Sequence, residues 1–419
     1  MTNLPKNLCL APFAYITFDP ANNVSPCPAL GGSTWNFQGQ TLKDIWHNDT
    51  LVNFRQHMME NGKHEVCNRC WYEESVGMDS QRTRLYNPNN DPTGDQTQIL
   101  GTELTAVDVL DKEFYKKGPM QLAIKVGNIC NLRCRSCNSS DSVTLSIEGQ
   151  YYADNYGLKD NFWLLETEPK VFTDQQIEEI LAVCHNVRRI EFYGGEPLVD
   201  KQMPKLLDKL VKQGLADKIQ LNISTNITHR MDDALIETLG HFEQVNINLS
   251  IDGWADKFTY LRHPAEWNKV YENIQWFMAL RDSQRIRMSL LPAITVTIMN
   301  VYDLPDLIVN IKQQFNLPVF LILAGHPAYF SIKNIPRKIA DAVVKRLETY
   351  DISELAPVIR ALNSSDDNEY WHWFKRVTAM IDQYRNENFK ETFKEYSNLI
   401  ESVDGPWPRS IKITKEETI

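Results

Sequence analysis

Apolar and polar residues alternate in six short stretches of the chain, beginning near residues 120, 189, 219, 245, 291 and 318. A period of two is typical of β-strands that bury one face. Between these stretches apolar residues recur at helical spacing, as in residues 206–211 and 267–277. Strands that alternate with helices indicate a parallel sheet with right-handed crossovers. The pattern therefore predicts an α/β core of six strand–helix units.

The flanking regions have different patterns. Two short amphipathic helices are expected at residues 42–46 and 51–55, and the segment after Pro336 has helical periodicity, with Tyr370, Phe374, Val377, Ile381 and Tyr384 on one face. The stretch before the core is rich in Asn, Asp, Thr and Gly and has little apolar periodicity. The predicted divisions are an N-terminal module at residues 1–75, a linker at 76–118, the core at 119–330 and a helical C-terminal extension at 331–419.

Composition limits the classes of partner. The chain has 419 residues and a net charge of −10, whereas a nucleic-acid-binding protein normally presents a basic surface. No apolar run is long enough to span a bilayer, and residues 1–7 lack the apolar core of a signal peptide. We therefore expect a cytoplasmic protein without a nucleic-acid or membrane partner. Its eight cysteines are expected to be reduced, without disulfides.

Three of these cysteines form a C-x3-C-x2-C triplet, Cys130, Cys134 and Cys137, on the loop that leaves the first core strand. Thiolates are soft ligands, and a [4Fe–4S] cluster usually takes four of them. Three closely spaced thiolates would leave one iron open for a ligand that is not protein. The alternatives are a partial zinc site or buried reduced thiols.

Polar residues follow the next strands. Gly194-Gly195-Glu196 ends the second core strand, and the later strands end near Ser224-Thr225 and Ser250, with Arg262 downstream. Glycines let the backbone approach a ligand closely, a carboxylate suits an ammonium group, and a guanidinium suits a carboxylate. Ordinary strand-end polar residues and a solvated arginine are the alternative interpretation.

The triplet, the Gly-Gly-Glu turn and these strand ends together resemble the radical S-adenosylmethionine (SAM) superfamily. The resemblance implies a partial (β/α)6 barrel and a [4Fe–4S] cluster on Cys130, Cys134 and Cys137 whose open iron binds SAM. It also implies SAM contacts from Gly194, Gly195 and Glu196 to the amino group, from Ser224, Thr225 and Ser250 to the ribose, and from Arg262 to the carboxylate. The residue before the third cysteine is usually aromatic in this superfamily, whereas here it is Ser136. This departure puts the packing of the adenine in doubt.

A second group of four cysteines lies near the N-terminus: Cys9, Cys27, Cys67 and Cys70. Their surroundings, including Pro-Cys, an Ile-Trp helix and a final C-x2-C, resemble the SPASM/twitch modules that carry auxiliary [4Fe–4S] clusters. Such modules usually follow the barrel, whereas this one precedes it. Four thiolates suffice for one fully ligated cluster, and a structural zinc site is the alternative. The eighth cysteine, Cys184, shares the apolar face of a helix capped by Thr173 and is expected in the core.

The resemblance implies reductive cleavage of SAM to a 5′-deoxyadenosyl radical that abstracts a hydrogen atom from the substrate. Peptide or protein modification is the leading expectation, and dehydrogenation or epimerisation of a carbohydrate, nucleoside or other small molecule is the alternative. A non-catalytic iron–sulfur or zinc scaffold or electron carrier is the alternative of another class. The enzyme would need an electron donor such as flavodoxin or ferredoxin. Asn300 and His326, which follow the last two strands, are expected to face the substrate.

Overall fold

The structure is a computed structural model that describes residues 8–30, 35–37, 39–86, 112–158, 163–365 and 369–408. Most of the predicted linker, residues 87–111, lies outside the described residues. The strands of the described residues form one sheet of nine, in the order β3-β2-β1-β4-β5-β6-β7-β8-β9, and the helices pack around it. The strands are β1 (Tyr15–Phe18), β2 (Asn23–Ser25), β3 (Trp35–Asn36), β4 (Gln121–Lys125), β5 (Arg189–Tyr193), β6 (Gln220–Thr225), β7 (Gln244–Ser250), β8 (Met288–Val296) and β9 (Phe320–Leu323).

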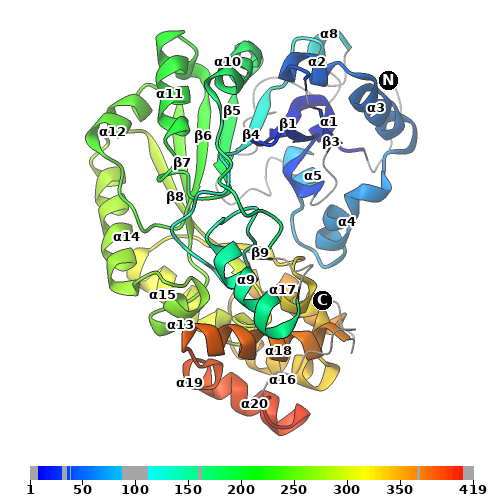
Figure 1. The fold of residues 1–419 in the computed structure, drawn as a ribbon, viewed down its shortest axis with the longest axis vertical. Coiled ribbons are helices and arrows are strands. Elements are labelled where there is room, and N and C mark those ends of the chain that lie inside the picture. The colour runs from blue at the N-terminus through cyan, green and yellow to red at the C-terminus, as the bar shows by residue number, and fades with distance from the viewer. Residues whose placement is uncertain are drawn as a thin grey trace.

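Strands β4 to β9 are the six strands that the alternation predicts, and each runs parallel to the next. The helices between them form the outer layer, as Figure 1 shows for α11, α12 and α14. This arrangement confirms the predicted α/β core of strand–helix units. The crossover helices are α10 (Asp174–Val183), α11 (Gln202–Lys212), α12 (Asp233–Leu239), α13 (Asp256–Leu261), α14 (Trp267–Asp282) and α15 (Leu304–Phe315).

The two faces of these strands have opposite character. In β7, Val245, Ile247 and Leu249 are fully buried in the apolar core. The alternate residues Asn246 and Asn248 instead line a cavity of about 230 Å³ inside the barrel. The apolar face therefore packs against the helices, and the polar face points into the barrel. Ser250, two residues beyond Asn248, continues this polar face to the end of the strand.

The N-terminal module is joined to the barrel through the sheet itself. Strand β1 pairs in parallel with β4, with Tyr15 opposite Gln121, and β2 and β3 add antiparallel strands at the edge. The sequence did not predict this junction. The two predicted helices are confirmed, and Thr41 and Asp44 form a capping box at the first. The described helices here are α1 (Ala11–Ala14), α2 (Leu42–Trp46), α3 (Asp49–Asn61), α4 (Asn68–Ser75), α5 (Gln81–Tyr86) and α8 (Lys112–Tyr115).

The C-terminal part of the chain is helical, as predicted, and lies at the end of the barrel that also carries α9 (Leu145–Tyr156) (Figure 1). Phe374, Val377 and Ile381 are buried, whereas Tyr370, predicted on the same face, is 37% exposed. None of the described helices is long and apolar enough to cross a membrane. The helices are α16 (Arg337–Leu347), α17 (Ala356–Asn363), α18 (Glu369–Arg385), α19 (Phe389–Thr392) and α20 (Lys394–Asp404).

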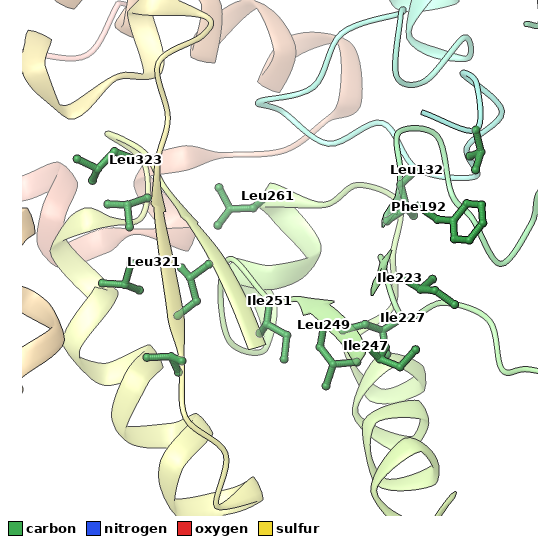
Figure 2. Close-up of a cluster of buried hydrophobic side chains, with 14 of the residues drawn as sticks. Leu132, Phe192, Ile223, Ile227, Ile247, Leu249, Ile251, Leu261, Leu321 and Leu323 are labelled. Carbon is green, nitrogen blue, oxygen red and sulfur yellow. The ribbon is translucent and has the colours of Figure 1, made fainter. Parts of the chain in front are cut away.

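The core extends directly beneath the predicted cysteine triplet. Leu132, between the first two cysteines, belongs to the same buried cluster as Phe192, Ile223 and Leu249 (Figure 2). Cys184 is also fully buried in this cluster, at the end of α10, and the predicted capping box of Thr173 and Gln176 opens that helix. The apolar core therefore anchors the loop from below while its cysteines remain at the surface of a cavity.

Candidate functional site

A cavity of about 810 Å³ lies at the carboxyl ends of the barrel strands. Ligands bind at this end in barrels of parallel strands. All ten residues that the sequence predicts for the cluster and for SAM line this cavity: Cys130, Cys134, Cys137, Gly194, Gly195, Glu196, Ser224, Thr225, Ser250 and Arg262. Its opposite wall comes from the N-terminal module and from the segment after β9. His326 and Ser136 line it as well.

The three cysteines of the loop are close enough to perturb one another electrostatically. Burial and, to a lesser extent, the neighbouring Cys134 thiol raise the pKa of Cys130 to about 12. Burial also raises the pKa of Cys137, with smaller contributions from Asp141, Cys134 and Cys130. A cation that binds thiolates would reverse this effect by stabilising the ionised form. The three thiols therefore form one group whose chemistry suits a soft metal centre.

The loop that carries them is fixed by its backbone. The Arg133 and Arg135 amides donate to the carbonyl oxygens of His263 and Leu261, at 2.6 and 3.0 Å. The Glu196 amide donates to the carbonyl oxygen of Ile129 at 2.9 Å. The segment after α13 and the Gly-Gly-Glu turn thus hold the loop from two sides.

The C-terminal extension also holds the loop, through buried ion pairs. Arg135 is 1% exposed, lies 3.5 Å from the ring centroid of Tyr260, and pairs with Asp382 at 2.6 Å and with Glu387. Asp382 lies on α18, so the last third of the chain helps to fix the triplet.

A second ion-pair network lies beside the first. Glu148 on α9 is fully buried and pairs with Arg385 at 2.8 Å and with Arg133 at 3.1 Å. Arg385 also donates to the carbonyl oxygen of Arg133 at 2.7 Å, and Tyr152 donates to Glu148 at 3.0 Å. Breaking a buried pair leaves an uncompensated charge and is strongly destabilising. We refer to Glu148, Arg385 and Arg133 as the loop clamp.

The Gly-Gly-Glu turn needs both of its glycines. Gly194 and Gly195 have φ angles of 72° and 50°, a region that residues with a side chain rarely adopt. A Cβ on Gly195 would also lie 2.6 Å from the Ile129 carbonyl oxygen. Any larger residue would therefore push the turn away from the cysteine loop.

Glu196 is 1% exposed, and its carboxylate accepts several hydrogen bonds from the protein itself. Its carboxylate accepts hydrogen bonds from the Thr225 hydroxyl at 2.8 Å and from the Asn226 amide at 2.6 Å. Burial raises its pKa, and these bonds oppose the shift. Glu196 therefore joins the ends of β5 and β6 in addition to facing the cavity.

Arg262 is placed between an acidic residue and a thiol. It pairs with Asp252 at 2.7 Å, and its Nη1 lies 3.9 Å from the Cys134 sulfur. Its Nε is buried and finds no hydrogen-bond partner among the residues that the structure describes. A buried donor without a partner costs free energy unless a ligand satisfies it. The guanidinium thus suits a carboxylate ligand in this cavity.

Sequence reasoning did not single out Asn226 as a site residue. Its amide lies 3.7 Å from the Cys130 sulfur and donates to Asn131 at 3.0 Å. Its place directly after Ser224-Thr225 was the signal that could have found it. The expectation for Asn300 was wrong, because it is 3% exposed and donates to the backbone oxygens of Asp252 and Thr295 instead of lining the cavity.

The four N-terminal cysteines also come together. Cys9 precedes α1, Cys27 precedes the short helix η1 (Pro28–Leu30), Cys67 ends η2 (Glu65–Cys67), and Cys70 lies in α4. Burial and, to a lesser extent, the nearby Cys70 and Cys67 thiols raise the pKa of Cys9 to about 12. The pKa of Cys27 is raised by burial and by the other three thiols. The module thus gathers thiols that are far apart in the sequence.

Within the described residues, no three or more His, Cys, Asp or Glu side chains are grouped in the way that a single metal ion requires. Sulfurs around one tetrahedral zinc ion are about 4 Å apart, whereas the cysteines of a four-iron cluster bind separate irons and lie farther apart. The cysteine triplet and the cysteine quartet both fit iron–sulfur clusters in the type of donor atom and in the number of donors.

Comparison with known proteins identifies both regions. The model of the radical SAM superfamily matches residues 124–302, and that of the SPASM iron–sulfur cluster-binding domain matches residues 9–71. The chain is a radical SAM protein with an N-terminal SPASM domain. The radical SAM domain uses a [4Fe–4S] cluster and SAM, and the SPASM domain binds an auxiliary cluster. Together the two domains account for more than half of the chain.

Relatives of this radical SAM protein are distant. It is 29% identical to molybdenum cofactor biosynthesis protein 1 of Dictyostelium discoideum over 40% of its own length and 23% of that protein. It is 27% identical to the GTP 3′,8-cyclase of Syntrophomonas wolfei over 40% of its own length and 44% of that enzyme. The chain thus matches less than half the length of either curated relative.

Solved structures show similarly distant likeness. One is native anSMEcpe with bound AdoMet and Cp18Cys peptide, with 16% identity, 60% of this chain and 63% of that chain covered, and a TM-score of 0.35. Another is Streptococcus suis SuiB bound to precursor peptide SuiA, with 14% identity, 85% and 70% covered, and a TM-score of 0.36.

Proposed function

We propose that this enzyme cleaves SAM reductively at a [4Fe–4S] cluster held by Cys130, Cys134 and Cys137, and that the resulting 5′-deoxyadenosyl radical abstracts a hydrogen atom from its substrate. One observation carries this proposal. All ten residues that the superfamily pattern assigns to the cluster and SAM line one cavity at the carboxyl ends of the strands. A scaffold protein would have no need for this arrangement.

The roles of the individual residues follow from their surroundings. Gly194 and Gly195 bring the backbone against the cysteine loop, and Glu196 would accept a hydrogen bond from the amino group of SAM at the same edge. Arg262, with its buried unpaired Nε, would bind the carboxylate of SAM. Ser224, Thr225 and Ser250 stand at the strand ends where the ribose would lie.

The N-terminal quartet, Cys9, Cys27, Cys67 and Cys70, would hold the auxiliary [4Fe–4S] cluster. Residues of the same module, including Val66 and Tyr72, line the wall of the cavity that faces the triplet. This placement suits a cluster that exchanges an electron with a substrate radical or braces the substrate cavity. Flavodoxin or ferredoxin would supply the electron for SAM cleavage.

Peptide or protein modification remains the first candidate for the substrate class. The cavity of about 810 Å³ must hold SAM and the reacting part of the substrate. Binding sites for one drug-sized ligand usually measure about 300–1,000 Å³, so the space beside SAM suits one side chain of a peptide or a small molecule. The second candidate is a reaction on a small molecule, because two relatives carry the name GTP 3′,8-cyclase.

The test is anaerobic incubation of the cluster-reconstituted enzyme with SAM and dithionite, followed by chromatography for 5′-deoxyadenosine. We expect slow formation without substrate and faster formation with a true substrate. Absence of 5′-deoxyadenosine in a preparation with full iron content would refute the proposed chemistry and favour a scaffold or electron carrier. Stimulation by peptides or by nucleotides would separate the two substrate classes.

A further inference from the structure

The wall of the cavity opposite the cysteine triplet carries an unusual lysine. Lys333 lies in the short helix η8 (Ile332–Asn334), after the last barrel strand, and lines the cavity. Its ammonium nitrogen is 2.9 Å from the ring centroid of Tyr72 on α4 of the SPASM domain. The barrel and the SPASM domain therefore meet at this wall, and the Lys333 ammonium group lies at their contact.

Lys333 is partly buried and is not neutralised by the protein. Among the residues that the structure describes, no acceptor bonds to its ammonium group and no carboxylate pairs with it. Burial lowers its pKa, and no charged neighbour opposes that shift. An ammonium group that loses water without gaining a partner is destabilised, so the tyrosine ring compensates only in part.

A second cation, Arg69, lies on the face of α4 that carries Tyr72. Arg69, Tyr72 and Glu73 of α4 are spaced three and four positions apart, so they lie side by side, and all three line the cavity. The Arg69 Nε donates to Glu73 at 2.9 Å, and within the described part of the chain its terminal nitrogens have no acceptor. Arg69 and Glu73 cancel in charge, which leaves Lys333 as the excess charge of this wall.

The opposite side of the cavity has the reverse character. It carries three thiols and the carboxyl groups of Glu196, Asp252 and Asp141. Asp252 pairs with Arg262 and Asp141 pairs with Lys125. A substrate that spans the cavity therefore meets a cationic wall on the SPASM side and an anionic, thiol-rich floor on the barrel side. Complementary charge at one end fixes the orientation of a ligand.

We infer that Lys333, assisted by the free edge of Arg69, binds an anionic group of the substrate, either a carboxylate or a phosphate. This inference rests on the proposed function and names one chemical feature of its substrate. The anion would supply the acceptor that Lys333 lacks and would hold the remainder of the substrate toward the cysteine triplet. Tyr72 would orient the ammonium group by contact with its ring.

The inference can be tested without knowledge of the substrate, with inorganic phosphate and acetate as probes. Calorimetric titrations would use the full chain with both clusters reconstituted, saturated with SAM, at low ionic strength. We expect Lys333→Gln to weaken binding of at least one probe by about tenfold or more, the loss that one hydrogen bond to a charged group represents. Lys333→Arg should keep most of the affinity because it keeps the charge.

Lys338→Gln is the matched control, because Lys338 is an exposed lysine five residues away that does not line the cavity. Its affinity for both probes should equal that of the wild type. Binding of phosphate alone would assign a phosphorylated substrate, and binding of acetate alone would assign a carboxylate. Equal binding of both would support an anion site that accepts either group. Failure of the wild type to bind either probe, or equal affinity in Lys333→Gln, would overturn the inference.

Formation of 5′-deoxyadenosine by the wild type, measured in the same preparation, tests the proposed chemistry separately. If the wild type forms none while anion binding still depends on Lys333, the radical chemistry fails and the anion site stands. If 5′-deoxyadenosine forms but anion binding does not depend on Lys333, only the anion site fails.

Discussion

The cysteine triplet of the barrel and the cysteine quartet of the SPASM domain differ in how the chain assembles them. The triplet lies within eight consecutive residues, on a loop that the Gly-Gly-Glu turn, the segment after α13 and α18 hold in place. The quartet extends from Cys9 to Cys70 and depends on the packing of several short helices and strands. Local sequence therefore brings the triplet together, whereas only the folded module brings the quartet together.

The electrostatic surroundings of the two groups also differ. Around the triplet, arginines are abundant, and Arg262 lowers the pKa of Cys134 against the effect of burial. Around the quartet, burial and the neighbouring thiols raise the pKa of Cys9 and Cys27. Backbone hydrogen bonds from Ala11 and Ala29 oppose the shift at Cys9 and Cys27 respectively, and Arg82 opposes it more weakly at Cys9. Ligand binding at the triplet is thus coupled to charged residues, whereas burial is the largest influence on Cys9 and Cys27 of the quartet.

The largest effect is expected from removal of the triplet. Replacement of Cys130, Cys134 and Cys137 by Ala should abolish formation of 5′-deoxyadenosine and leave iron at the quartet, because the two groups are built on separate elements. Iron analysis and chromatography after anaerobic incubation measure both effects. A triple variant that still forms 5′-deoxyadenosine would show that the cleavage site has been misassigned.

Removal of the quartet should have a different result. Reconstituted wild type should contain roughly eight irons per chain, the sum of two four-iron clusters. Replacement of Cys9, Cys27, Cys67 and Cys70 by Ala should halve that content and stop substrate turnover, while slow cleavage of SAM without substrate continues. One zinc and four irons per wild-type chain would instead make the module a structural zinc site.

A smaller effect is expected from disruption of the loop clamp, which should reduce iron retention at the triplet and not at the quartet. Arg385→Met leaves Glu148 buried with Arg133 as its remaining partner, and we expect a loss of about 3 kcal/mol in the free energy of unfolding. Iron retention at the triplet should fall as well, and the quartet should keep its iron. Denaturant unfolding and iron analysis provide the measurements.

Two further variants give this experiment its controls. Lys212→Met removes an exposed pair with Asp208 and should change stability little. The double variant Glu148→Gln with Arg385→Met should recover part of the stability, since it removes the uncompensated charge. No recovery in the double variant would mean that packing, and not charge, dominates the contribution of Arg385.

The smallest effect is expected on the affinity for SAM. Gly195→Ala should weaken SAM binding, because a left-handed backbone costs an alanine about 1–2 kcal/mol and its Cβ would press on the Ile129 carbonyl oxygen. Gly214→Ala is the control, since Gly214 also has a positive φ of 67° but has open space around its Cβ position. SAM affinity by calorimetry should fall in the first variant and stay at the wild-type value in the second.

The sequence predicted the parts of the fold that depend on short-range patterns. The six core strands appear where residues alternate, and the helix after Thr173 begins with the expected capping box. The triplet and the strand-end residues were recognisable because their spacing is local or follows the strand order, and the quartet because its surroundings resemble a SPASM/twitch module. Their gathering on one cavity follows from parallel strands, whose carboxyl ends share one edge.

Only the tertiary structure decided the contacts between distant segments. Pairing of β1 with β4, the clamp of Arg385 on Glu148 and the contact of Lys333 with Tyr72 join residues that are more than 100 positions apart. The spacing of apolar residues along the chain carries no information about such pairs. For the same reason Asn300, which was expected to face the substrate because it follows a strand, instead lies buried in a turn. The net charge of the cavity wall opposite the cysteine triplet depends on which of its cations pair with carboxylates. This pairing is fixed only when the chain is folded.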